Sequence, residues 1–417
     1  MIDIKTESQF PSITRDDWEA LVENGLKSGK LRDLMRKTED GIIRGPLSTL
    51  GDRPDNIAPC PRYGVPLLNG RPWHITAPVR GPDTAFANTQ MLEDLKGGAS
   101  AVRVETRTLP ITARNLKRLF EGIYTDLIPI CFDRFGPDVA DDRSALISAL
   151  LSIPPLQSAH MNLGLHPTMD IDILTPVIAD LPKTWRAFTL NLGETSDVLE
   201  LATLAAFTVE AMRKGGPEHV HNSLVIELYT NQDAHMGIAK IRAARRIYAT
   251  IAKSFGLTDI SVPIRALNSR RMMQRIDPWS NMLRVMSASF GAVVGGADYI
   301  LSRPFTDAIG HATPFGHRVA RNMQLLMMEE SHLGHVSDPA YGSYFHERMT
   351  EDLGQAAWSK FQEIEAAGGV THYQESGAYH ADILAAQAAY DRQDAPIVGV
   401  TLHPAKTNRT AKVRGAF

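Results

Sequence analysis

The chain has 417 residues, of which 43% are hydrophobic, 22% charged and 7% aromatic, a composition typical of a soluble globular protein with one large domain or two to three smaller ones. Its formal net charge is −3, so no field of a single sign supports binding to nucleic acid or to a membrane surface. The chain has two cysteines, Cys60 and Cys131, which excludes a disulfide framework and a cysteine-built zinc site.

The first residues, MIDIKTESQF, lack the basic and apolar regions of a signal peptide. No apolar run approaches the roughly 20 residues that a membrane-spanning helix needs. We therefore expect a cytoplasmic protein with no membrane contact.

Residues 1–70 are predicted to form a helical and extended N-terminal arm. Apolar spacing over residues 15–38, with Asp16 and Asp17 near the start, favours helix. Gly25 and Gly29 divide this stretch into two short helices. Residues 45–71 contain too many glycines and prolines for a regular element, and we expect them to lie extended over the rest of the molecule.

Between residues 71 and 316, short apolar runs alternate with segments of helical periodicity. The runs with the length of a β-strand are 73–79, 101–105, 128–133, 160–166, 187–193, 223–230, 260–267 and 299–305. The helical segments include 84–95, 111–119, 143–151, 196–212, 233–255 and 281–295. Eight strands alternating with helices over about 230 residues predict an α/β fold, a (β/α)₈ TIM barrel.

A doubly wound open sheet is the competing architecture. It requires a ligand fingerprint at its switch point, and neither GxGxxG after a strand nor GxxxxGK[ST] occurs. Residues 317–417 are mostly helical in pattern, with a last apolar piece at 397–402, and are predicted to pack beside the barrel.

Barrel active sites lie at the C-terminal ends of the strands, and many polar residues occupy those positions. They are Arg103, Glu105, Arg107, Asp133, Arg134, His166, Asn191, Glu227, Tyr229, Asn231, Arg265, Asn268, Ser269 and Arg303. These residues could form a polar mouth, or they could be ordinary loop-end charges that pair with one another.

Several histidines are candidate metal ligands. His160, His166 and Asp170 are possible ligands, but ligands on separate strand ends cannot be recognised from local spacing, and we predict no metal site. His332, His335 and His346 fall in the late helical part and are predicted to lie at a surface or an interface. No GxSxG, HExxH or SxxK motif occurs, so the residues alone assign no chemistry.

Longer stretches are far more specific. They are IAKIRAARRIY (238–248), DPWSNMLRVMSASFGAVVGGADYI (277–300), the segment 304–358 with its ARNMQ, EES and VSDPAYGSYF motifs, IEAAGG (364–369) and the late IVGV (397–400). In these motifs the chain resembles the methylmalonyl-CoA mutase family, the adenosylcobalamin-dependent acyl-CoA mutases. Agreement is dense over residues 200–400 and thinner over 18–105.

The resemblance implies a barrel whose axis holds an acyl-CoA ester, capped by a cobalamin domain. The chain departs from this pattern because it stops where the family's catalytic subunit continues into a Rossmann-like cobalamin domain. The DxHxxG loop that supplies the lower cobalt ligand is absent, and the nearest string, DAHMG at 233–237, has the wrong spacing. We expect this chain alone to bind no cobalamin, and adenosylcobalamin to be bound by a partner chain.

A second departure concerns the active-site positions that the resemblance implies. Thr189 or Leu190 stands where the family has a Tyr-His pair, and Ser223, with Val225 near it, stands where it has a catalytic arginine. Arg265 and Leu267 replace a His and a Gln. A buried carboxylate at Glu227 would repel the phosphates of an acyl-CoA ester.

The combined pattern resembles the family's small (β) subunit, which keeps the barrel without the active site. It implies a large catalytic mutase subunit as the partner, wrapped by the N-terminal arm, with acyl-CoA bound in the complex. One alternative is a barrel-only catalytic chain with a separate cobalamin-binding chain. Its candidates for binding a different acyl-CoA are Arg103, Glu105, Glu227, Arg265 and Arg303. The other alternative is a non-catalytic scaffold paralogue.

Overall fold

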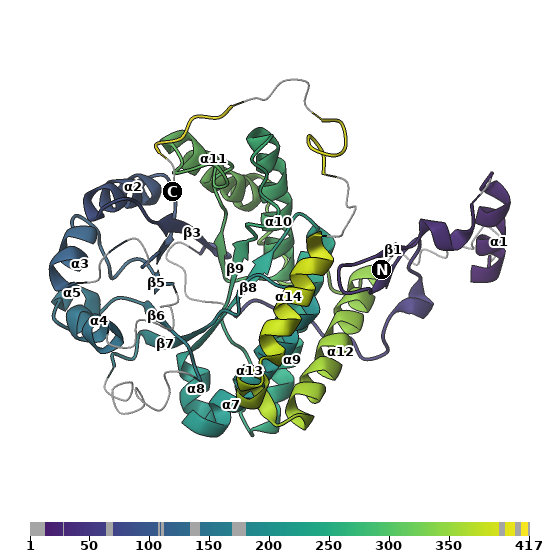
Figure 1. Cartoon of the computed structure of the whole chain (residues 1–417), viewed down its shortest axis with the longest axis horizontal. Helices are drawn as coiled ribbons and strands as arrows, with labels where there is room; N and C mark the ends of the chain where they lie inside the picture. Colours follow the sequence, from purple (N-terminus) through teal and green to yellow (C-terminus); the bar gives the residue numbers. More distant parts are fainter. Residues whose placement is uncertain are drawn as a thin grey trace, which may run out of the picture.

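The computed structural model describes residues 13–27, 29–63, 70–106, 109, 112–133, 142–168, 181–391, 397–404 and 410–415. At its centre is a closed barrel of parallel strands in the ring order β10-β3-β4-β5-β6-β7-β8-β9 (Figure 1). The strands are β3 (His74–Val79), β4 (Ala101–Val104), β5 (Ile130–Phe132), β6 (Met161–Leu165), β7 (Trp185–Leu190), β8 (Leu224–Thr230), β9 (Ile264–Asn268) and β10 (Tyr299–Leu301). The predicted TIM barrel is confirmed.

Helices surround this ring on the outside (Figure 1). They are α2 (Thr84–Lys96), α3 (Ala113–Leu119), α4 (Asp142–Leu151), α5 (Pro154–Gln157), α7 (Asp197–Gly215), α8 (Pro217–Ser223), α9 (Ala234–Ser254), α10 (Asn281–Gly295) and α11 (Pro314–Leu325). Side-chain caps fix the start of two long helices, since Ser196 accepts from the backbone N–H of Leu199 and Asp233 from that of Met236. The helical segments predicted between the strands are all present.

Three strand boundaries differ from the prediction by three residues or more. The strand predicted at 299–305 ends at Leu301, and the other two differences have local reasons. The strand predicted at 260–267 begins only at Ile264 because Pro263 has no N–H to donate, and Ser261 donates its N–H to the Asp259 side chain in a turn. The strand predicted at 187–193 ends at Leu190, since the Asn191 side chain accepts from the Gly193 N–H and turns the chain.

The N-terminal arm contains less helix than predicted. It consists of α1 (Arg15–Gly25), a 3₁₀ turn (Leu31–Leu34), a small hairpin of β1 (Arg36–Lys37) and β2 (Ile43–Arg44), and a second 3₁₀ turn (Leu50–Asp52). The second predicted helix is therefore wrong beyond one turn. Figure 1 shows α1 standing away from the barrel.

The later part of the arm lies against the outside of the barrel, as predicted. The Cys60 N–H donates to Asp338 and the Tyr63 N–H donates to Asp298, both at 2.8 Å. Arg242 of α9 joins Asp338 to Glu347 in a buried ion-pair network. These contacts fix residues 58–63 to the body of the molecule.

The C-terminal part is helical, as predicted. A π-helical turn (Leu326–Glu330) precedes α12 (Tyr344–Ala366), α13 (Gly369–Glu375) and α14 (Ala378–Asp391). The helix α12 packs on α7 and α9, whereas α14 buries none of its residues.

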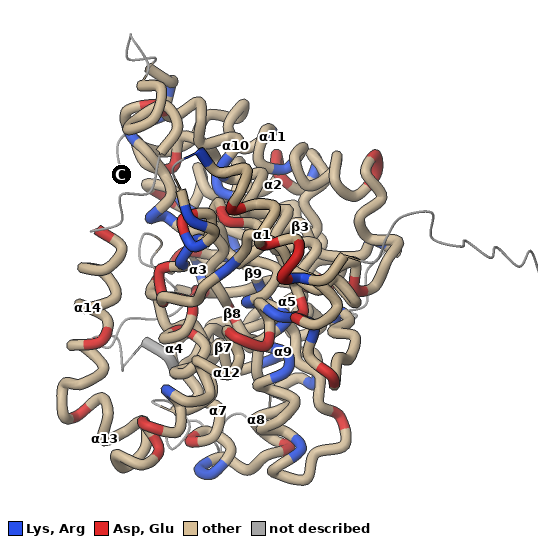
Figure 2. Tube along the Cα trace, turned by 90° about the vertical axis from the view of Figure 1, so that its right-hand side faces the viewer, with Lys and Arg blue, Asp and Glu red and all other residues tan. Residues whose placement is uncertain are grey.

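The main hydrophobic core lies between the strands and the surrounding helices and includes Trp73, Phe132, Phe188 and Phe207. Acidic and basic residues are interspersed along the described part of the trace (Figure 2), in agreement with the small net charge. Within the described residues, no helix has both the length and the apolar character needed to cross a bilayer.

Candidate functional site

Side chains from opposite walls of the barrel meet on its axis. The strands β4 and β8 stand four places apart in the ring of eight, so they face each other across the interior. Arg103 of β4 donates from Nε and Nη2 to the two carboxylate oxygens of Glu227 on β8, at 3.1 and 3.0 Å. This two-pronged ion pair therefore bridges the diameter of the barrel.

Glu227 gathers two further donors at the same place. Arg265, its cross-strand neighbour on β9, donates from Nη1 at 3.0 Å, and the Asn191 amide donates to the other oxygen. Burial opposes ionisation of Glu227, which is 1% exposed, but attraction to Arg103 and Arg265 outweighs it and lowers the Glu227 pKa to about 2. The carboxylate is therefore charged at any physiological pH.

A hydrogen-bonded group on neighbouring strands fills the adjoining wall. The Thr189 hydroxyl and the Cys131 thiol both donate to the side-chain oxygen of Asn162, the thiol at 3.3 Å. The Asn162 amide donates to the Phe188 carbonyl at 3.1 Å. Burial raises the pKa of the Cys131 thiol to about 12, so it is not a nucleophile near neutral pH.

Aromatic rings close the other side of the interior. His74 of β3 stacks on Tyr299 of β10 with ring centroids 4.9 Å apart, and the Arg265 guanidinium lies 5.3 Å from the Tyr299 ring. Burial lowers the pKa of His74 to about 4, so its ring is neutral at pH 7. The interior is thus filled by polar groups around the bridge, most of them hydrogen-bonded, although His74 Nε2 and Arg265 Nε have no partner among the described residues.

A second charged cluster lies at the C-terminal mouth of the barrel. Arg303 donates to Asp307 at 2.9 Å, Arg80 also contacts Asp307, and the Arg80–Glu105 separation is 3.8 Å. Burial and repulsion from Arg270 and Arg80 lower the pKa of Arg303 to about 10. This cluster gathers guanidinium groups at the end of the barrel where TIM-barrel active sites occur.

Some of the predicted mouth residues separate into two groups, whereas Asp133 bonds to Thr106, Ser269 to Glu194 and Asn268 to Arg303. The interior bridge consists of Arg103, Glu227 and Arg265, joined by Asn191. The mouth cluster includes Glu105 and Arg303. Tyr229 links the groups weakly, because its hydroxyl accepts from the Asn191 amide at 3.4 Å. Arg107, Arg134 and Asp170 lie outside the described residues.

The histidine candidates do not converge. His160 is exposed before β6 begins, whereas His166 is buried after the strand ends, so the two are at opposite ends of β6. His332 stacks on His335, while His346 instead lies 3.0 Å from His235. Over the ranges that the structure describes, no group of three or more His, Cys, Asp or Glu side chains could hold a metal ion.

The positions that the family resemblance marks as altered are all buried. Thr189 and Leu190 lie on β7 and point to opposite faces of the strand, whereas Arg265 and Leu267 share one face of β9. Ser223 ends α8, before β8 begins, and thus lies at the N-terminal end of that strand.

Sequence reasoning missed several residues of the interior and the mouth, namely His74, Arg80, Asn162, Tyr299 and Asp307. A usable signal was present for some of them. Strands of a parallel barrel are covered on both faces and are normally apolar throughout, so polar residues at alternate positions mark the inner wall. The run HITAPV with His74 and Thr76 has this pattern.

Comparison with known proteins gives a consistent result. The family model described as "Methylmalonyl-CoA mutase" matches residues 198–414. The chain is 33% identical to "Methylmalonyl-CoA mutase small subunit" of Streptomyces virginiae, covering 96% of this chain and 72% of that protein.

Two further relatives extend this similarity. The chain is 30% identical to the small subunit of Propionibacterium freudenreichii subsp. shermanii, over 87% of this chain and 63% of that protein. It is also 34% identical to "Methylmalonyl-CoA mutase" of Rhizobium meliloti, over 93% of this chain and 63% of that protein. The relatives are therefore longer than the chain.

Proposed function

The chain belongs to the methylmalonyl-CoA mutase family, and from this premise we propose that it is a catalytically silent small subunit that stabilises a large catalytic mutase subunit. The complex would interconvert an acyl-CoA pair of the methylmalonyl-CoA and succinyl-CoA type, and it would work in the cytoplasm.

The observation that carries this proposal is the bridge of Arg103, Glu227 and Arg265. The resemblance implies that an active barrel holds the acyl-CoA ester along its axis, and here the axis is crossed by the Arg103–Glu227 ion pair. Opening it would leave buried charges without partners, at a cost of about 3–5 kcal/mol. An acyl-CoA ester could therefore enter the axis only by displacing this bridge.

The N-terminal arm supports a role in assembly. Large hydrophobic side chains are exposed along residues 13–50, namely Ile13, Leu21, Leu34, Ile43, Leu47 and Leu50. No residue of α1 is buried. Binding of a partner would remove these exposed apolar side chains from water, and a partner that binds only the folded chain stabilises it by mass action.

The described residues do not fit the lower ligand of cobalamin. His235, the histidine of the string DAHMG, lies in the first turn of α9, and its Nδ1 is 3.0 Å from the His346 ring, with the Phe345 ring in a T-shaped contact. The resemblance implies a lower ligand on a DxHxxG loop, whereas His235 lies on a barrel helix. We therefore assign adenosylcobalamin to the partner chain.

Purification of the tagged chain from its native cells, with mass analysis of the proteins that accompany it, tests this assignment. We expect a stoichiometric large mutase chain. Recovery of a separate small cobalamin-binding chain alone would contradict the proposal and would favour the barrel-only catalytic alternative, for which the arginines at the mouth are the supporting observation.

Measuring the turnover of the assembled complex tests directly whether this barrel takes no part in catalysis. Tyr229→Phe removes a hydroxyl at the mouth, and Arg303→Gln removes a guanidinium. If the barrel is silent, both variants keep turnover within about twofold. A loss of about 100-fold, or about 2.7 kcal/mol in the barrier, would mean that the mouth cluster takes part in the reaction.

A further inference from the structure

A cavity of about 820 Å³ lies on the outer surface of the barrel, away from the interior and the mouth. Its walls are the arm residues 56–62, the second half of α9, residues 260–262 before β9, and the middle of α12. Since residues 260–262 precede a strand, the cavity is at the N-terminal end of the barrel. Its volume falls in the range of about 300–1,000 Å³ that is usual for small-molecule sites.

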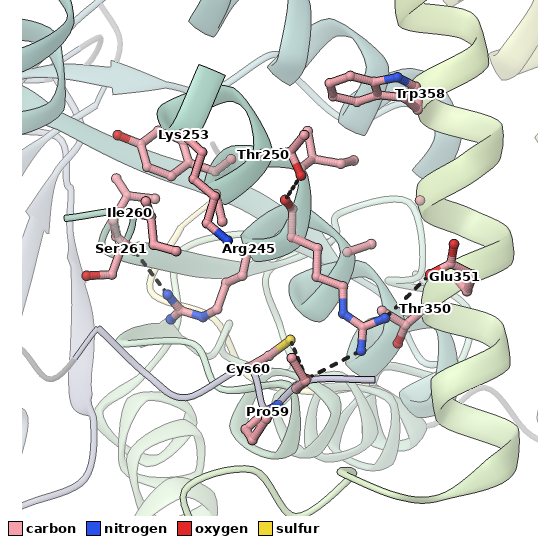
Figure 3. Close-up of a pocket in the computed structure, with 18 of the residues that line it drawn as sticks. Pro59, Cys60, Arg245, Thr250, Lys253, Ile260, Ser261, Thr350, Glu351 and Trp358 are labelled. Atoms are coloured by element: carbon pink, nitrogen blue, oxygen red, sulfur yellow. Dashed lines mark hydrogen bonds and ion pairs between the residues drawn. The ribbon is translucent and has the colours of Figure 1, made fainter. Parts of the chain in front are cut away.

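The walls combine apolar surface with cationic side chains. Ile247, Ile260 and Trp358 are among the apolar lining residues, and Arg62, Arg245, Arg246 and Lys253 line the same space against the single carboxylate of Glu351. Figure 3 shows Lys253 and Arg245 directed into one region, with Glu351 and Trp358 on the α12 side.

Not all of this positive charge is compensated. Arg245 pairs with Asp298 at 2.8 Å, and Arg246 pairs with Glu347 at 2.6 Å. Among the ion pairs of the described residues, none involves Lys253 or Arg62. The Arg62 guanidinium instead donates to two backbone carbonyls, that of Val293 in α10 and that of Ala297 just after the helix. The cavity therefore has a cationic excess on the side of Lys253.

A glycine in α12 contributes to the open wall of the cavity. Gly354 lines the cavity in the interior of a helix of 23 residues, where glycine costs about 1 kcal/mol relative to alanine. A Cβ built at Gly354 meets no atom within 4 Å, so neither packing nor backbone conformation requires glycine there. A side chain larger than alanine at this position would extend into the cavity.

We propose that this cavity binds a small organic anion with an apolar body, its charge facing Lys253 and its body lying against the wall that includes Trp358 and Gly354. The ligand class follows from the cationic excess and the apolar walls. This site is separate from the barrel interior and does not depend on the subunit role proposed above.

The probe for the test is 1-anilinonaphthalene-8-sulfonate, and N-phenyl-1-naphthylamine is its uncharged counterpart. Fluorescence titration of the full chain should give saturable binding of the sulfonate and clearly weaker binding of the amine. Lys253→Gln should weaken sulfonate binding by about fivefold and leave the amine unchanged. Gly354→Leu, which fills the cavity, should abolish saturable binding of both probes.

Two matched variants control for general effects. Lys117→Gln removes an exposed lysine of α3, and Gly354→Ala changes the helix without filling the cavity, so both should bind the sulfonate as the unmodified chain does. Equal binding of the two probes, or sulfonate binding that is unchanged in Lys253→Gln and Gly354→Leu, would overturn the proposal. Release of the sulfonate on addition of an equimolar large mutase chain would also overturn it, because the occupant would then be protein.

Discussion

Replacing Glu227 by Gln tests the bridge across the barrel, because it removes the one negative charge that Arg103 and Arg265 share. The bridge lowers the pKa of Glu227 from 4.5 to about 2, which corresponds to about 3 kcal/mol of stability. The variant also removes the carboxylate to which both buried guanidinium groups are bound. We therefore expect Glu227→Gln to lower the free energy of unfolding by about 3–5 kcal/mol.

The pH dependence has a definite sign. The folded-state pKa of Glu227 lies below its ordinary value of 4.5, so its contribution is fully present above pH 4.5 and disappears as the pH falls toward 2. Urea unfolding followed by far-UV circular dichroism should therefore give a large difference between the unmodified chain and Glu227→Gln at pH 7. The difference should shrink below pH 4.5.

A surface variant supplies the comparison. Glu329 is 61% exposed and lies 3.9 Å from Arg71, so Glu329→Gln should change the unfolding free energy by less than about 1 kcal/mol. Adding Arg103→Met to Glu227→Gln should recover part of the loss, because one uncompensated charge is removed. If Glu227→Gln is no more harmful than Glu329→Gln, or if its effect does not vary with pH, the reasoning is refuted.

Other parts of the structure give further expectations. Deleting residues 1–53 keeps the contacts of residues 58–63 but removes Glu39 and Arg44, which pair with Arg271 and Asp233 on the body of the molecule, so the melting temperature should fall by several degrees. Affinity for the large mutase chain, measured by titration calorimetry, should fall at least about tenfold, and intact assembly would remove the case for the arm. Asp338→Asn breaks the buried ion pair with Arg242 and weakens the acceptor of the Cys60 N–H. The free energy of unfolding in urea should fall by about 3 kcal/mol, and a loss as small as that of an exposed ion pair would contradict this expectation. Since burial raises the Cys131 pKa to about 12, iodoacetamide at pH 8 should leave Cys131 unmodified in the native chain, and a modified peptide in the mass spectrum would contradict its placement.

The sequence by itself determined the strands, the barrel and the family. Each strand is a short run of mostly β-branched or apolar residues, and in each helix the apolar residues recur with helical spacing. Both signals are local, so the elements can be recognised one after another along the chain. The motifs around residues 238–248 and 336–345 were likewise contiguous. Local reasoning failed where a single side chain redirects the backbone, as Asn191 does after β7.

The arrangement of the site was decided only by the tertiary structure. Arg103 and Glu227 are separated by 124 residues, and their meeting depends on ring closure, which places β4 opposite β8. From the sequence, both were charges at strand ends, and nothing distinguished a ligand site from a bridge. Asn162, Tyr299 and the cationic cavity beside Lys253 became visible for the same reason, since packing and register bring distant residues together in ways that no local pattern contains.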